Sequence, residues 1–196
     1  MKFARNSIFL GLLATSALSH SAGSARVVCD RYYPALEVTY NTAADAGIPG
    51  LLWVGVLTPD QTGMAFYSGK TKGWEPYTGG LYPFHSRYDG GFPRTIKVTV
   101  PFPGQNYTTR EYIGYTVYAG NGVLTPAMRD QVRDRRDALN SVKADIVAKG
   151  MWRSEFDSDD YHTLALVMQD LQANKKYGMI YSIPFVDCNP SDGGGG

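Results

Sequence analysis

The chain contains two cysteines, Cys29 and Cys188, which lie near its two ends. An even number of cysteines in an exported protein of this size is typical of a disulfide, whereas reducing compartments keep thiols free. A bond between these two residues would bring both ends of the folded domain together, which restricts its topology more than any other feature of the sequence. Two free thiols are the alternative. A cysteine nucleophile is excluded if the bond forms, because a disulfide sulfur is not a thiolate.

The first residues of the chain indicate export. A basic start is followed by an apolar run over residues 8–18 and then by small residues up to Ala25, which is the pattern of a secretory signal peptide. We predict that residues 1–25 form this leader, with cleavage after Ala25 and an alternative site after Ser21. A membrane-spanning helix needs about 20 apolar residues, and neither the leader nor any later segment reaches that length. A buried N-terminal helix is the alternative interpretation.

Charge argues against several classes of partner. The whole chain has a net charge of +1, and the leader removes Lys2 and Arg5 but no acidic residue, so the mature protein is close to neutral. A neutral balance gives no general attraction to nucleic acid or to an anionic membrane. We therefore expect no nucleic-acid partner. Residues 26–189 are predicted to form a single domain, and residues 190–196 a disordered glycine-rich tail.

The middle of the chain is typical of an antiparallel β-protein. Short segments rich in β-branched and aromatic residues alternate with turns that contain glycine and proline. The run 51–57, "LLWVGVL", is apolar throughout and predicts a central strand, with 64–67 as its hairpin partner. The other strands are expected at 36–40, 95–100 and 111–120.

The sequence changes from a strand-like to a helix-like pattern at Thr125. This threonine is a predicted N-cap, Pro126 is suited to the first helical position, and Gly150 follows the last turn of a long helix. Apolar residues at helical spacing predict a stripe that packs on the sheet; they are Met128, Val132, Leu139, Val142 and Ile146. A second helix is expected within 158–178, capped by Ser158 or Asp159 and stopped by Gly178.

The last segment, "MIYSIPFVDC", predicts a strand that returns Cys188 to Cys29. The fold class is therefore α+β: an antiparallel β-sandwich-like sheet, two helices and a returning C-terminal strand. Pro184 confines the last strand to an edge or to its own end. An open edge over residues 180–186 would be able to accept a partner's strand.

The common linear motifs of catalysis and nucleotide binding are absent from the sequence. Two histidines remain outside the leader, His85 and His162. A zinc site would need further ligands, and the two cysteines are not available because they are expected to form the disulfide. We therefore predict no metal, no cofactor and no catalytic residue. The acidic segment 155–160 has three interpretations: a helix N-terminus, a calcium site or an acid–base pair. The run "RDQVRDRRD" is interpreted as a solvated helix face, with a partner-binding helix as the alternative.

Aromatic side chains are concentrated in residues 74–93, "WEPYTGGLYPFHSRYDGGFP". Long ordered loops on a sheet often carry function, and aromatic rings there stack on sugars or anchor a protein partner. The alternative is that the rings close one end of the core. The candidate binding residues are Trp74, Tyr77, Tyr82, Phe84, Tyr88 and Phe92.

Two functional hypotheses follow. The first is an exported, non-enzymatic binding protein of the bacterial cell envelope or surface, located in the periplasm or outside the cell. It would be adhesin-like, a pilus or surface-assembly component, or a periplasmic accessory factor, with a protein or glycan partner. The second is a secreted hydrolase acting on cell-wall or polysaccharide substrate, which requires carboxylates such as Glu75, Asp89 and Asp160 to converge.

Overall fold

The computed structural model describes residues 23–104 and 106–189, so the predicted leader up to residue 22 and the predicted tail lie outside the described residues. The strands are β1 (Gly23–Asp30), β2 (Tyr33–Asn41), β3 (Gly50–Leu57), β4 (Met64–Ser68), β5 (Gly73–Pro76), β6 (Ser86–Tyr88), β7 (Thr95–Pro101), β8 (Thr116–Val123) and β9 (Tyr177–Ser182). The helices are α1 (Pro126–Ala148) and α2 (Asp160–Ala173), with short 3-10 turns η2 (Ala43–Asp45), η3 (Arg110–Tyr112) and η4 (Ser154–Asp157).

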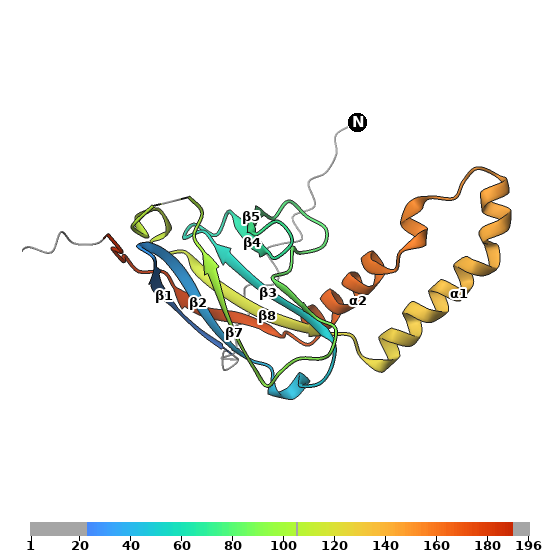
Figure 1. Cartoon of the computed structure of the whole chain (residues 1–196), viewed down its shortest axis with the longest axis horizontal. Coiled ribbons are helices and arrows are strands. Elements are labelled where there is room, and N and C mark those ends of the chain that lie inside the picture. The colour runs from blue at the N-terminus through green and yellow to red at the C-terminus, as the bar shows by residue number, and fades with distance from the viewer. Residues whose placement is uncertain (1–22, 105, 190–196) are drawn as a thin grey trace, which may run out of the picture.

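The strands form two antiparallel sheets. One sheet has the order β1-β2-β7, and the other has the order β5-β4-β3-β8-β9 with β6 also pairing with β3. The two sheets pack on one another in a sandwich-like arrangement, and the last strand returns to the larger sheet beside β8 (Figure 1). The predicted α+β class is confirmed.

Strand β3 is the centre of the domain because both of its faces are buried. Leu52 and Val54 point into the core between the two sheets, together with residues of β2, β7 and β8. Leu51 and Trp53 point to the opposite face and pack against Val167 of α2. Successive side chains of a strand alternate between faces, so burial on both sides explains the unbroken apolar run from Leu51 to Leu57.

Helix α2 lies directly on the backbone of β8. A Cβ atom placed on Gly122 would stand 2.1 Å from the carbonyl oxygen of Val167, and one placed on Gly120 would stand 2.7 Å from a methyl group of Leu171. These two glycines therefore let the helix approach the sheet more closely than any side chain would allow. The four helical steps from Val167 to Leu171 cover about the same length as the two strand steps from Gly122 to Gly120, so the helix follows β8 in that direction.

Helix α1 does not pack on the sheet, which corrects the prediction made from its apolar stripe. Thr125 accepts a hydrogen bond from the amide of Met128 and caps the helix as expected. However, α1 contains no buried residue and stands away from both sheets, with α2 leading back from its far end (Figure 1). The end of the outer face of β8 that lies next to the start of α1 is already occupied by α2. Val142 of the predicted stripe is exposed. Neither described helix has the combination of length and apolar character needed to cross a membrane.

Three other local predictions differ from the structure. Strand β8 begins at Thr116, not at residue 111, because Arg110–Tyr112 forms a 3-10 turn. Gly178 pairs with Ala119 inside β9, and α2 ends before it at Ala173. Beyond Ser182 the chain pairs with the segment 107–115: Ile183 donates to Tyr115, and Thr109 donates to Val186. The predicted open edge over 180–186 is therefore occupied along its second half.

The two ends of the domain are joined as predicted. Cys29 of β1 and Cys188 form a disulfide, with their Cα atoms 5.4 Å apart and 159 residues apart in sequence. The predicted leader cleavage after Ala25 falls inside β1, which begins at Gly23, whereas the alternative after Ser21 precedes this strand. The position of cleavage stays a prediction.

We expect the disulfide to contribute up to about 5 kcal/mol to the free energy of unfolding, since it closes a very long loop in the unfolded chain. Chemical denaturation with and without a reductant measures this contribution. A variant with Cys29→Ser and Cys188→Ser serves as the control, because a reductant should not change its midpoint. Equal midpoints for oxidised and reduced wild type would contradict the expectation.

Substituting Gly122 should displace α2. We expect Gly122→Ala to lower the free energy of unfolding by about 1–3 kcal/mol, because the new Cβ atom meets backbone that cannot move without shifting the helix. Gly178→Ala is the matched control: it also lies in a strand, but a Cβ atom there meets nothing within 4 Å. Thermal or urea unfolding of the two variants should differ clearly, and equal stabilities would show that α2 does not depend on this approach.

Candidate functional site

A pocket of about 760 Å³ opens on the outer face of the larger sheet. Its walls come from β3, β4, β8, β9, the end of α2 and the loops 60–63 and 77–82. They include Trp53, Gly55, Leu57, Met64, Phe66, Tyr77, Tyr82, Tyr118, Leu171, Gln172 and Tyr177. The volume falls within the range of small-molecule sites, which are concave and mostly apolar.

The pocket exists because α2 covers only one end of this face. Leu171 stands over Gly120, the helix ends at Ala173, and the chain then turns away. The part of β8 around Tyr118 and the facing part of β3 from Gly55 to Leu57 are left without a helix above them. Gly55 adds no side chain to the floor.

Three aromatic rings form one wall of the pocket. Phe66 stacks on Tyr82 with ring centroids 4.7 Å apart, and Tyr77 meets both rings edge-on, at 5.8 Å from Phe66 and 4.9 Å from Tyr82. Such pairs are favourable beyond their buried area. Burial, followed by the proximity of Tyr82, raises the pKa values of Tyr77 and Tyr177, so both hydroxyls stay neutral at physiological pH.

Most polar groups of the walls are already hydrogen-bonded within the protein. Trp53 Nε1 donates to the carbonyl oxygen of Tyr82 over 3.1 Å, and Gln172 Nε2 donates to the Tyr82 hydroxyl over 3.1 Å. The Tyr77 hydroxyl donates to the carbonyl oxygen of Gly80. These bonds fix the loop 77–82 against the sheet.

Among the lining residues that the structure describes, Asp60 is the one with a charged side chain. It closes the turn between β3 and β4, where it accepts hydrogen bonds from the hydroxyls of Thr58 and Thr62 and from the amide of Thr62. These bonds, that of Thr58 first, lower the pKa of Asp60. The Asp60 carboxylate therefore stabilises this turn through hydrogen bonds to neighbouring residues, as aspartates commonly do.

The six candidate aromatic residues separate into two groups. Trp74, Tyr88 and Phe92 pack against or within the core between the sheets, and Trp74 Nε1 donates to the carbonyl oxygen of Pro101, which joins β5 to β7. Tyr77, Tyr82 and Phe84 pack against the second cluster on the outer face. Of the six, Tyr77 and Tyr82 line the pocket.

Sequence reasoning did not select the remaining pocket residues. Trp53 and Leu57 lie in a run that was interpreted only as a buried strand, and Tyr118 and Tyr177 lie in strands far apart in the sequence. The available signal was the alternation in β3, since Trp53, Gly55 and Leu57 share one face. It does not indicate whether a helix covers that face.

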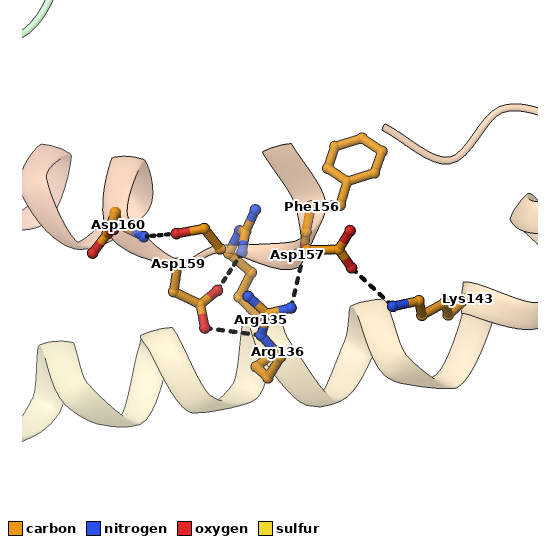
Figure 2. Close-up of polar contacts among 8 residues, drawn as sticks. Arg135, Arg136, Lys143, Phe156, Asp157, Asp159 and Asp160 are labelled. Carbon is orange, nitrogen blue, oxygen red and sulfur yellow. Dashed lines mark hydrogen bonds and ion pairs between the residues drawn. The ribbon is translucent and has the colours of Figure 1, made fainter. Parts of the chain in front are cut away.

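The acidic segment 155–160 joins α1 to α2. Asp159 accepts hydrogen bonds from Arg135 and Arg136, and Arg136 also donates to the carbonyl oxygen of Phe156 (Figure 2). Asp157 binds Lys143 over 2.8 Å. In the described part of the chain, no group of three or more His, Cys, Asp or Glu side chains is placed to hold a metal ion.

Ser158 and Asp159, the two predicted capping residues of α2, have different roles in the structure. Asp159 occupies the N-cap position but makes no capping hydrogen bond, because its carboxylate faces the two arginines. Ser158 Oγ accepts a hydrogen bond from the amide of Asp160. The hydrogen bond from Arg136 is the largest influence that lowers the pKa of Asp159, and the charge of Arg135 adds to it.

The candidate carboxylates of a hydrolase are engaged at other places. Glu75 accepts a hydrogen bond from Thr71, and Asp160 meets Arg87 at 3.4 Å on the surface. Asp89 is exposed beyond β6. None of the three is among the residues that line the pocket.

A buried charged cluster lies at the other end of α2. Lys176 Nζ donates to Asp45 and Asp170 over 2.9 Å each, and Asn121 donates to Asp45 over 2.6 Å. Asp170 also accepts from the amide of Val123. Burial alone would lower the pKa of Lys176, but its two carboxylate partners together raise it. Each carboxylate has its partners within the cluster, which fastens α2 and β9 to β8.

His85 is placed in the structure as a packing residue. Its Nδ1 lies 2.6 Å from the hydroxyl of Ser86, and its ring packs beside that of Tyr67. Burial and then the charge of Lys72 lower the pKa of His85, so the ring is neutral at physiological pH.

Comparison with models of known protein families, with curated proteins and with solved structures found no match to this chain.

We expect Asp159→Asn to lower the free energy needed to separate α1 from the segment before α2 by about 1 kcal/mol, because the two arginines lose a charged partner in a partly buried position. Since the pKa of Asp159 is lowered by folding, its contribution is present above the unfolded value near 4 and is lost as the pH falls through the folded value. Hydrogen exchange of the α1 amides between pH 6 and pH 3 measures this. Asp130→Asn is the control, because Asp130 only pairs with Arg133 on the exposed face. Equal protection in the two variants would contradict the role of Asp159.

Proposed function

We propose that the protein is an exported, non-enzymatic binding protein of the bacterial cell envelope or surface, and that the pocket bounded by Tyr77 and Tyr82 is its binding site. The observation that carries the proposal is the pocket itself. It is concave, walled by aromatic rings and mounted on a sheet whose inner face packs on the other sheet and whose outer face is partly covered by α2, so its walls are held in place before any ligand arrives.

The chemistry of the lining favours binding over catalysis. General acid–base catalysis relies most often on histidine or carboxylate side chains, whereas the described lining has no histidine and one carboxylate, which is used by a turn. The hydrolase hypothesis gains no support from the positions of Glu75, Asp89 and Asp160.

Export is supported by the disulfide and by the leader-like first residues. The bond between Cys29 and Cys188 is of the kind that persists in an oxidising compartment. The periplasm, the cell surface and the external medium all meet this condition. An adhesin-like role, a part in pilus or surface assembly and a periplasmic accessory role belong to the same proposal, with a protein or a glycan as partner.

The proposal is tested with the mature protein as bait in extracts of the native envelope. We expect wild type to retain a partner or ligand that a variant with Tyr77→Ala and Tyr82→Ala loses at least tenfold, since these rings form the pocket wall. Tyr161→Ala is the matched control, because this tyrosine is exposed on α2 and lies outside the pocket. Equal retention by all three proteins would contradict binding at this site.

Two further results would overturn the proposal. Mass spectrometry of protein recovered from its host should show a cleaved leader and an intact disulfide, and a leader still attached would contradict export. Hydrolysis of a polysaccharide that is lost in Glu75→Ala or Asp160→Ala would make the protein a hydrolase.

A further inference from the structure

The walls of the pocket select a chemical class of ligand, an inference that rests on the proposed binding function of this site but differs from a protein or glycan as its partner. We infer that the pocket binds a small, uncharged and mainly apolar molecule, with room for one hydrogen-bonding group. Three properties of the lining carry this inference: its charge, the hydrogen bonds that its polar groups already make within the protein, and the available hydroxyls of Tyr118 and Tyr177.

The lining offers little charge complementarity to an ionic ligand. Among the residues that the structure describes, no Lys, Arg or His lines the pocket, so an anion would find no cation in this part of the chain. Asp60 is the one charged group, and both of its oxygens already accept hydrogen bonds from the turn that it closes. A charge moved from water into such a site would lose its hydration without an equivalent partner. A neutral ligand avoids this loss.

The polar groups of the walls argue against a sugar. A bound sugar ring buries several hydroxyls, each of which needs a partner, and an unmatched buried hydroxyl costs about 1–3 kcal/mol. Trp53 Nε1 and Gln172 Nε2 are used to hold Tyr82. Aromatic stacking alone would not offset several unmatched hydroxyls.

The hydroxyls of two tyrosines on the strands of the pocket are available for a polar group on the ligand. Within the described residues, the side chains of Tyr118 and Tyr177 make no hydrogen bond, and both line the pocket. They come from adjacent strands, β8 and β9, which lie on the other side of β3 from Phe66 of β4. An alcohol, phenol or carbonyl oxygen on an otherwise apolar body fits this arrangement.

The inference is tested with N-phenyl-1-naphthylamine, a neutral and apolar dye whose fluorescence rises when it leaves water. We expect the full mature protein to bind one dye molecule. Three competitors of equal size then separate the classes: 1-naphthalenemethanol, 1-naphthoate and 1-naphthylmethylammonium. The neutral alcohol should displace the dye at a concentration at least tenfold lower than either ion, and chitin or maltose oligosaccharides should not displace it.

The site of binding is checked with a pair of variants at Met64, a half-exposed lining residue of β4. Met64→Arg places a cation and a longer side chain at the pocket and should weaken dye binding at least tenfold. Its charged end is able to reach water, so the fold should persist, and circular dichroism verifies this. Met64→Leu is the matched control and should bind as wild type does.

Each contrary result overturns the inference. Absence of dye binding, equal binding by Met64→Arg and Met64→Leu, or equal displacement by the ions and the alcohol would each exclude an uncharged apolar ligand in this pocket. These failures are distinct from failure of the proposed function. If an oligosaccharide or a protein is retained by wild type and lost with Tyr77→Ala and Tyr82→Ala while the dye does not bind, the binding function stands and the ligand class falls.

Discussion

The contact between α2 and the bare backbone of β8 is the constraint on which the rest of the structure depends. Gly120 and Gly122 allow Leu171 and Val167 to rest on the strand, and the helix then covers one end of the outer face. The same contact buries the second face of β3 and excludes α1 from the sheet. Because the helix ends over Gly120, it also leaves the remainder of the face open as the pocket.

Helix α2 is held to the sheet by apolar packing along its length and by polar contacts at its C-terminal end. Lys176 binds Asp45 and Asp170, and Asp170 also accepts a hydrogen bond from the amide of Val123 at the end of β8. A buried charge cluster of this kind adds little net stability compared with an apolar core, but removal of one member leaves another charge unpaired. The cluster therefore fixes the position at which the helix stops. The pocket wall contributed by Leu171 and Gln172 depends on that position.

The part of the chain that carries α1 is built differently. Its contacts with the returning segment are charged and half-exposed, notably Arg135 and Arg136 with Asp159, and α1 buries no residue fully. Contacts of this kind are weaker than core packing and respond to pH and salt. The pocket and its supporting core are therefore separate from the least strongly held part of the domain.

The sequence by itself determined the local elements whose signals are chemical and short-range. Thr125 and Pro126 indicated the start of α1, and the apolar run 51–57 indicated the central strand. Two cysteines in a chain with a leader-like start indicated the disulfide that joins the ends of the domain. Strand β1 gave no such signal, because its first residues resemble the end of a leader. Its turn also places Arg31 and Tyr32, instead of glycine or asparagine, at positive φ.

Only the tertiary structure decided which face each element buries and where the pocket lies. The apolar stripe of α1 is compatible with packing on a sheet or on another helix, and periodicity does not distinguish the two. The six aromatic residues of 74–93 divide equally between the core and the outer face of the larger sheet, because they pack against elements from distant parts of the chain. A binding surface assembled from β3, β4, β8, β9 and α2 is a property of long-range packing, whereas sequence patterns report neighbours along the chain.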